Sequence, residues 1–187
     1  MGMRLRHLRL PSTLLACACV MLTLAQCSSS NDARPAAPTT SLLVTYGPEP
    51  TASAKMVCGT EGQTELGAAL RVQASQITTP TWVDHVYRCT YEYPSGSFTL
   101  SVKELPSISN TIDYFTSLKA KYTVAQPLAL GQEGFTATDG TSIVRKDNKV
   151  LVVDVSKLPD QFGTPAQSRS NASATIAITL LGCWTGE

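Results

Sequence analysis

Two neighbouring segments of this chain alternate between apolar and polar residues, and this pattern constrains the fold more than any other feature of the sequence. The segments are residues 85–93 and 97–104, joined by Pro94-Ser95-Gly96. One side of the alternation carries Tyr87, Cys89, Tyr91 and Tyr93 in the first segment and Phe98, Leu100 and Val102 in the second. A period of two is typical of a β-strand with one buried face. The sequence therefore predicts an antiparallel hairpin with these residues facing the core.

The other elements follow from similar periodicities. Apolar residues spaced by three and four predict helices over residues 54–70, 107–122 and 171–183. Alternation and turn residues predict further strands over residues 135–138, 141–146 and 149–155. Tight turns imply antiparallel pairing, and one polar face per strand implies a sheet with one face in water. We therefore predict an α+β fold, a two-layer sandwich with a mostly antiparallel sheet of about five strands and its helices on one face.

The N-terminus has the pattern of a lipoprotein signal peptide. A basic head contains Arg4, Arg6 and Arg9, and residues 12–25 are apolar or small. That run is shorter than the ~20 residues of a membrane-spanning helix, but it suits a secretory signal. Leu24-Ala25-Gln26-Cys27 then resembles the bacterial lipobox, whose cysteine is acylated, with palmitate among the acyl chains. We expect a signal peptide over residues 1–26 and lipidation of Cys27.

Two alternatives to this N-terminus remain open. Leu14-Leu15-Ala16-Cys17 fits the lipobox better locally, because a small residue normally precedes the cysteine and Gln26 departs from that pattern. Cleavage there would leave an apolar region of only about five residues, shorter than the usual 7–15. The other alternative is a plain secreted protein in which Cys27 is an ordinary thiol.

Composition divides the rest of the chain into a tether and a domain. Residues 27–54 are rich in Ser, Thr, Ala and Pro, which predicts a disordered tether, apart from a candidate edge strand at residues 42–46. Residues 55–187 are enough for a single α+β domain. Loss of Arg4, Arg6 and Arg9 changes 15 Lys+Arg against 14 Asp+Glu to 12 against 14, a net charge of about −2. Without clustered cations, nucleic-acid binding has no support, and attachment to a membrane would depend on the lipid.

Three cysteines remain in the domain, namely Cys58, Cys89 and Cys183. Export would place them outside the reducing cytosol, so we expect one disulfide. Cys89 faces the core in its predicted strand, and Cys58 lies near the start of a helix that should pack on that face. These positions favour a Cys58–Cys89 bond, and Cys58–Cys183 remains the alternative.

The sequence offers one candidate binding patch, formed by Trp82, Asp84 and His85 where a strand begins. His85 is the single histidine of the domain, since His7 lies in the signal peptide. Metal sites need several converging ligands, and no such spacing occurs, so we expect no metal and no cofactor. No nucleophile motif surrounds a serine, and we therefore assign no catalytic residue.

Three segments of the domain resemble small actinobacterial surface lipoproteins of unknown function. They are Val57-Cys58-Gly59, residues 82–91 and Leu180-Leu181-Gly182-Cys183-Trp184. The resemblance implies a location and a fold, with the cysteines as structural positions, and it carries no catalytic residues.

We expect a non-enzymatic lipoprotein on the outer face of the cytoplasmic membrane, whose domain binds an envelope protein or a small ligand. The alternatives are a carrier of an apolar envelope molecule and an exported hydrolase that would depend on His85. A cavity above ~300 Å³ lined by Tyr87, Tyr91 and Phe98 would favour the carrier.

Overall fold

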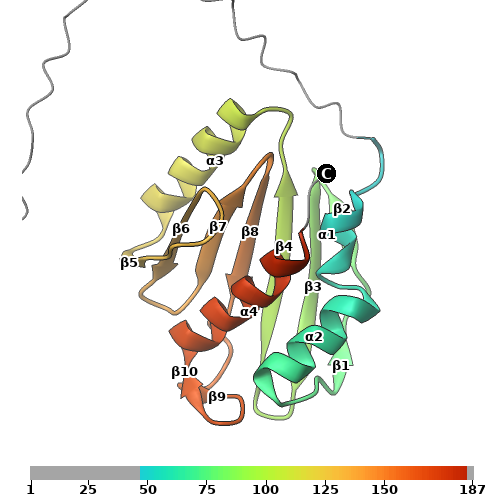
Figure 1. The fold of residues 1–187 in the computed structure, drawn as a ribbon, viewed down its shortest axis with the longest axis vertical. Coiled ribbons are helices and arrows are strands. Elements are labelled where there is room, and N and C mark those ends of the chain that lie inside the picture. The colour runs from blue at the N-terminus through green and yellow to red at the C-terminus, as the bar shows by residue number, and fades with distance from the viewer. Residues whose placement is uncertain (1–46, 185–187) are drawn as a thin grey trace, which may run out of the picture. The chain divides into compact units, whose positions relative to one another are not determined.

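The central feature of the domain is an antiparallel sheet of eight strands, in the order β1-β3-β4-β8-β7-β6-β5 with β2 also paired to β3 (Figure 1). The computed structural model describes residues 47–184. The strands are β1 (Gln76–Ile77), β2 (Thr81–Val83), β3 (Val86–Tyr93), β4 (Gly96–Glu104), β5 (Val124–Pro127), β6 (Glu133–Ala137), β7 (Ser142–Lys146) and β8 (Lys149–Asp154). The short strands β9 (Gln161–Phe162) and β10 (Gln167–Ser168) form a separate pair. The predicted α+β class and antiparallel sheet are confirmed, and the sheet is larger than the five strands expected.

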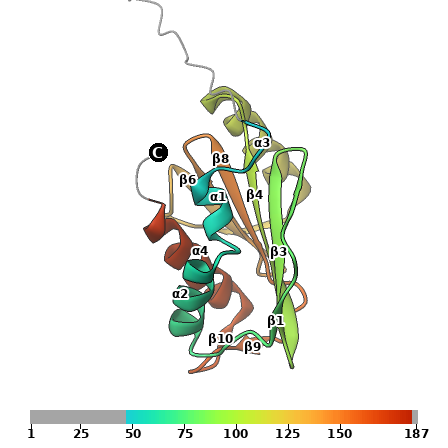
Figure 2. The same ribbon diagram turned by 90° about the vertical axis from the view of Figure 1, so that its right-hand side faces the viewer.

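Helices cover both faces of this sheet. They are α1 (Ala52–Met56), α2 (Thr60–Leu70), α3 (Ile108–Lys121) and α4 (Arg169–Cys183). Figure 2 shows α1, α2 and α4 on one face, here called the inner face, and α3 on the other, the outer face. The expected sandwich had all helices on one face, and the structure differs from it in the position of α3, which packs on the other face.

The inner face is formed by the residues that the alternation in β3 and β4 predicted. Cys89, Tyr91, Phe98, Leu100 and Val102 are all buried, and the Tyr91 and Phe98 rings stack with centroids 4.8 Å apart. Residues 94 and 95 form the turn between the two strands, which end at the Tyr93–Gly96 pair. Gly96 has φ +150°, and a Cβ there would lie 2.3 Å from the Lys157 carbonyl oxygen, so this position needs glycine.

The position of α3 has a clear cause in β7 and β8, where consecutive residues are apolar. Val144 and Leu151 belong to the inner core, whereas their neighbours Ile143 and Val150 point to the outer face. These outer residues need cover of their own, and Phe115 and Leu118 of α3 provide it together with Phe135. The face that a helix covers therefore depends on which side of the strands has apolar residues that still need burial. The periodicity of the helix itself does not indicate that side.

The disulfide links β3 to the segment between α1 and α2. Cys58 and Cys89 are bonded with their Cα atoms 6.0 Å apart, which confirms the favoured pairing and excludes Cys58–Cys183. Cys183 is a free, half-buried thiol at the end of α4. The predicted helix over residues 54–70 is divided here, because α2 begins after its N-cap Gly59. The disulfide therefore holds the segment between α1 and α2 against strand β3.

Ordered structure begins earlier than the predicted end of the tether at residue 54. Pro50 and Ala54 are buried, and α1 begins after the N-cap Thr51. Packing against the sheet provides the apolar burial that local composition does not indicate. The lipidation at Cys27, the alternative at Cys17 and the candidate edge strand at residues 42–46 lie outside the described residues.

Candidate functional site

The predicted patch lies at the tip of the β2–β3 hairpin. Asp84 and His85 form its two-residue turn with φ of 49° and 56°, and positive φ at both positions matches the twist of a hairpin. The turn is fastened to β4, since the His85 carbonyl accepts a hydrogen bond from the Glu104 N–H at 2.9 Å and Lys103 Nζ donates to the Asp84 carbonyl. The tip is therefore held against the sheet by its backbone.

Trp82 faces the inner side of the hairpin and has a structural contact. Its indole N–H donates to the Pro48 carbonyl at 2.9 Å, and its ring meets His85 edge-on with centroids 5.5 Å apart. The indole nitrogen is thus engaged by the first described residues of the chain. Of the three residues of the predicted patch, Trp82 and His85 are in contact. Asp84 instead lies on the outer side of the hairpin.

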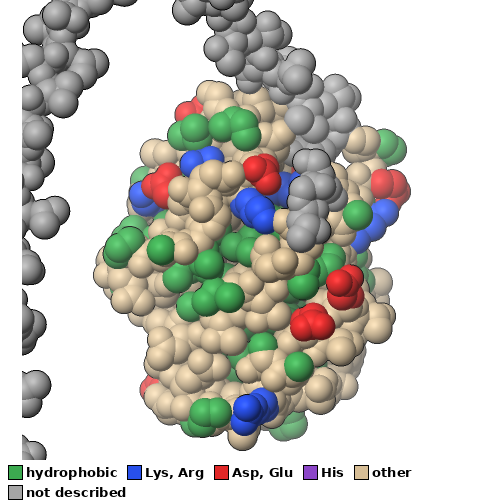
Figure 3. All heavy atoms as spheres, in the orientation of Figure 1, with side chains coloured by type: hydrophobic (Ala, Val, Ile, Leu, Met, Phe, Trp, Pro, Cys, Tyr) green, Lys and Arg blue, Asp and Glu red, His purple; other side chains and the backbone are tan. Residues whose placement is uncertain are grey.

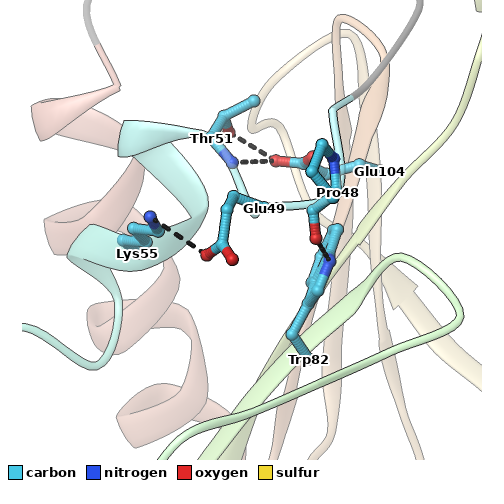
Figure 4. A network of polar contacts seen from close by, with 6 residues as sticks. All are labelled: Pro48, Glu49, Thr51, Lys55, Trp82 and Glu104. Atoms are coloured by element: carbon cyan, nitrogen blue, oxygen red, sulfur yellow. Dashed lines mark hydrogen bonds and ion pairs between the residues drawn. The ribbon is translucent and has the colours of Figure 1, made fainter.

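A buried carboxylate ties the same N-terminal residues to the sheet (Figure 4). Glu104 is 1% exposed, and its Oε1 accepts from the Thr51 backbone N–H at 3.1 Å and from the Thr51 hydroxyl. Glu49 and Lys55 form an ion pair at 3.6 Å beside it. We call residues 48–51 the strap, because they cross from the hairpin tip to α1. The alternation in β4 places Glu104 on the core face and is the sequence signal for this contact.

The outer face of the hairpin carries an open hollow of about 290 Å³. It is lined by Thr81, Val83, Asp84, Val86 and Arg88. The sheet register pairs Thr81 with Arg88 and Val83 with Val86, which puts four of these side chains on one face in two rows. Val83 is 63% exposed, the largest exposure among the large hydrophobic side chains of residues 47–184. Of the predicted patch, only Asp84 lines this hollow.

Two tyrosines lie near Arg88 on this side of the sheet, Tyr114 in α3 and Tyr122 at the C-cap of α3. Burial raises the pKa of Tyr114, and the Arg88 guanidinium partly offsets that effect. Burial also raises the pKa of Tyr122, with further increases from Asp154, Asp139 and Tyr114 and a decrease from Arg88. Both effects show that the Arg88 charge lies close to the two phenols. Within residues 47–184, no carboxylate lies at ion-pair distance from Arg88.

The inner aromatics leave little space for a ligand. The hollow that reaches Tyr91 and Tyr93 holds about 50 Å³, far less than the ~300 Å³ at the lower end of ligand pockets. The Tyr91 hydroxyl donates to the Val57 carbonyl at 2.7 Å, and Tyr93 packs edge-on against Phe162. These rings act as core, and an apolar cargo of drug size would not fit between them.

In the described part of the chain, the face of the molecule that carries α4 has no single large apolar patch. Figure 3 shows hydrophobic side chains there as several separate groups among polar ones. On α4, Ile178 is 55% exposed, which is comparable to Val83 on the opposite side of the sheet. These two residues provide a matched pair for testing which face is used.

Among residues 47–184, no three His, Cys, Asp or Glu side chains are grouped so that they could hold a metal ion. No helix in this part of the chain combines the length and hydrophobicity needed to cross a bilayer.

Sequence reasoning missed Arg88, Val83 and Val86 as site residues. The alternation did place Arg88 on the outer face of its strand, but whether a carboxylate among residues 47–184 lies within ion-pair distance of it depends on the three-dimensional fold. Strand β2 has three residues, too few for a periodic signal. Comparisons of the chain with protein-family models, with curated proteins and with solved structures find no match.

Proposed function

We propose that this protein is a lipid-anchored binding protein of the cell envelope, held at Cys27 on the outer face of the cytoplasmic membrane, whose domain binds a ligand without catalysis. The observation that carries the proposal is the open outer face of the β2–β3 hairpin. It combines an exposed valine, a hollow and a guanidinium that has no ion-pair partner among residues 47–184, whereas most other apolar side chains of the sheet are covered.

The strap supports this arrangement. Pro48 is bonded to Trp82, and Thr51 is bonded to Glu104, so the chain reaches the domain beside the hairpin. A tether that begins at Cys27 would then join the domain on the inner side of the hairpin, which leaves the outer binding face clear of the strap. The backbone contacts of the Asp84-His85 turn give that face a fixed shape, and pre-organisation lowers the ordering cost of binding.

Site-specific cross-linking tests the proposal in intact cells. A photoreactive amino acid replaces Val83 in the full-length protein, and the same change at Ile178 is the matched control. We expect a light-dependent adduct, read as added intact mass, at position 83 and little at position 178. Equal yields at both positions, or none at 83, would contradict binding by the hairpin face.

Two companion measurements test the anchor and the absence of catalysis. Cys27→Ala should move the protein out of the membrane fraction, and retention there to the same extent would refute the lipid anchor. A panel of hydrolase substrates should show no turnover with the wild-type protein. Turnover that disappears in His85→Ala, with an unchanged melting temperature, would show an enzymatic role instead.

A further inference from the structure

The hollow on the hairpin has two chemically different ends. Val83 and Val86 form a cross-strand pair next to the tip, and Thr81 and Arg88 form the next pair on the same face. Two residues along a strand span roughly 7 Å, so the backbone positions of the apolar pair and of Arg88 lie about that far apart along the hairpin. In β4, Lys103 continues the valine row and Ser101 continues the arginine row.

The charges around the hollow are unequal. Arg88 has no ion-pair partner among residues 47–184, and Lys103 donates to the Asp84 carbonyl. Asp84 is the one carboxylate of the lining and stands at the tip, next to Lys103 and at the valine end. The Arg88 end therefore has a positive charge with five N–H donors, in a geometry that suits a carboxylate or a phosphate.

We propose that this hollow binds a small amphipathic anion, with its carboxylate or phosphate on Arg88 and its apolar body against Val83 and Val86. The inference rests on the proposed function and names its ligand class. A volume of about 290 Å³ is close to the lower limit of ligand pockets, so it suits a small molecule or the charged end of a larger one. Thr81 and Ser101 are the cross-strand partners of Arg88, and their hydroxyls are chemically suitable donors to the same anionic group.

Titrations with three probes of similar shape test the inference. Phenyl phosphate, benzoate and uncharged benzyl alcohol are added to the full mature protein, and binding is followed by chemical shifts and calorimetry. We expect at least one anion to bind about 10-fold or more tightly than benzyl alcohol, with shifts at residues 81–88. Comparison of the two anions distinguishes phosphate from carboxylate as the preferred group.

Substitutions test whether Arg88 provides the positive charge that binds the anion. Arg88→Gln should weaken anion binding about 10-fold or more, because a charge-assisted hydrogen bond is lost. Arg88→Lys should keep part of it as a point charge. Lys157→Gln, which removes the same charge beside the β3–β4 turn at the opposite end of the sheet, should change nothing.

The inference and the proposed function can fail separately. Equal binding of the three probes, no binding of either anion, or unchanged anion affinity in Arg88→Gln would overturn the anionic ligand class. Cross-linking at position 83 that persists in Arg88→Gln cells would then leave the hairpin as a binding face for an uncharged ligand.

Discussion

The two halves of the sheet differ in how many of their faces are buried: the half with β7 and β8 buries both faces, and the half with β3 and β4 buries one. In β7 and β8, apolar residues occupy consecutive positions, and helices cover both sides. In β3 and β4 the buried apolar residues occur at every second position and face only α1, α2 and α4. The outer side of this second half is not part of the hydrophobic core, and most of its residues are exposed or half-buried, which is why we propose it as the binding surface. Alternation in a strand indicates where a surface is available for function as well as where the core lies.

The largest expected effect comes from shortening a side chain on the outer face of the covered half. Phe135 is 1% exposed and meets Phe115 with ring centroids 5.5 Å apart, so Phe135→Ala should lower the free energy of unfolding by about 3–5 kcal/mol. On the same face of the open half, Val86→Ala should cost less than about 1 kcal/mol. Denaturant unfolding of both variants measures the difference. Equal costs would mean that the two halves are covered alike.

The disulfide should be the next largest effect, because it links the open half to its single layer of helices. The bond closes a loop with a sequence separation of 31 residues, so the chain-entropy model gives it roughly 3.5 kcal/mol. The double variant Cys58→Ala/Cys89→Ala should lose about that much in denaturant unfolding. Cys183→Ala is the control and should stay near the wild type, since this half-buried thiol is in no disulfide and its hydrogen bond to the Thr179 carbonyl is weak. A loss below about 1 kcal/mol in the double variant would show that packing alone holds β3 to the helices.

The smallest effect appears only at alkaline pH and concerns the inner face of the open half. Burial raises the pKa of Tyr93 to about 12, from about 10 in an unfolded chain. Between these values the folded state keeps the phenolic proton and the unfolded state loses it, so stability should fall as the pH rises through this interval. Urea unfolding at a series of pH values should show a shallower fall in Tyr93→Phe than in the wild type. The other tyrosines whose pKa burial raises contribute to the remaining slope, namely Tyr87, Tyr91, Tyr114 and Tyr122. An identical slope in the variant would place Tyr93 in contact with water.

Sequence patterns predicted the parts of the fold in which local periodicity and burial agree. The hairpin of β3 and β4, helix α4 and the Cys58–Cys89 bond are examples, since each depends on which face a residue occupies. Strands β2 and β5 were missed because β2 is only three residues long and β5 is exposed along its whole length. The outer position of α3 was missed because a helix pattern shows which side of the helix is apolar and not which side of a sheet it meets.

The candidate site was predictable only in part. The sequence indicated Trp82, Asp84 and His85 as a binding patch, and the structure places them at the tip of the β2–β3 hairpin. It also gives Trp82 a hydrogen bond to the strap and places the hollow on the other side of the hairpin. Arg88 became a candidate because it lines the hollow and has no ion-pair partner among residues 47–184. Both properties depend on the three-dimensional arrangement, so no local pattern could identify them.

Amide hydrogen exchange on the intact lipidated protein tests the central claim, that the outer face of the hairpin is the binding surface. Exchange would be measured by mass spectrometry in detergent, with and without an extract of the native envelope. The account predicts slower exchange over residues 81–88 and 99–103 when the extract is present, with α4 unchanged. Slower exchange confined to α4, or no change anywhere in residues 47–184, would contradict it.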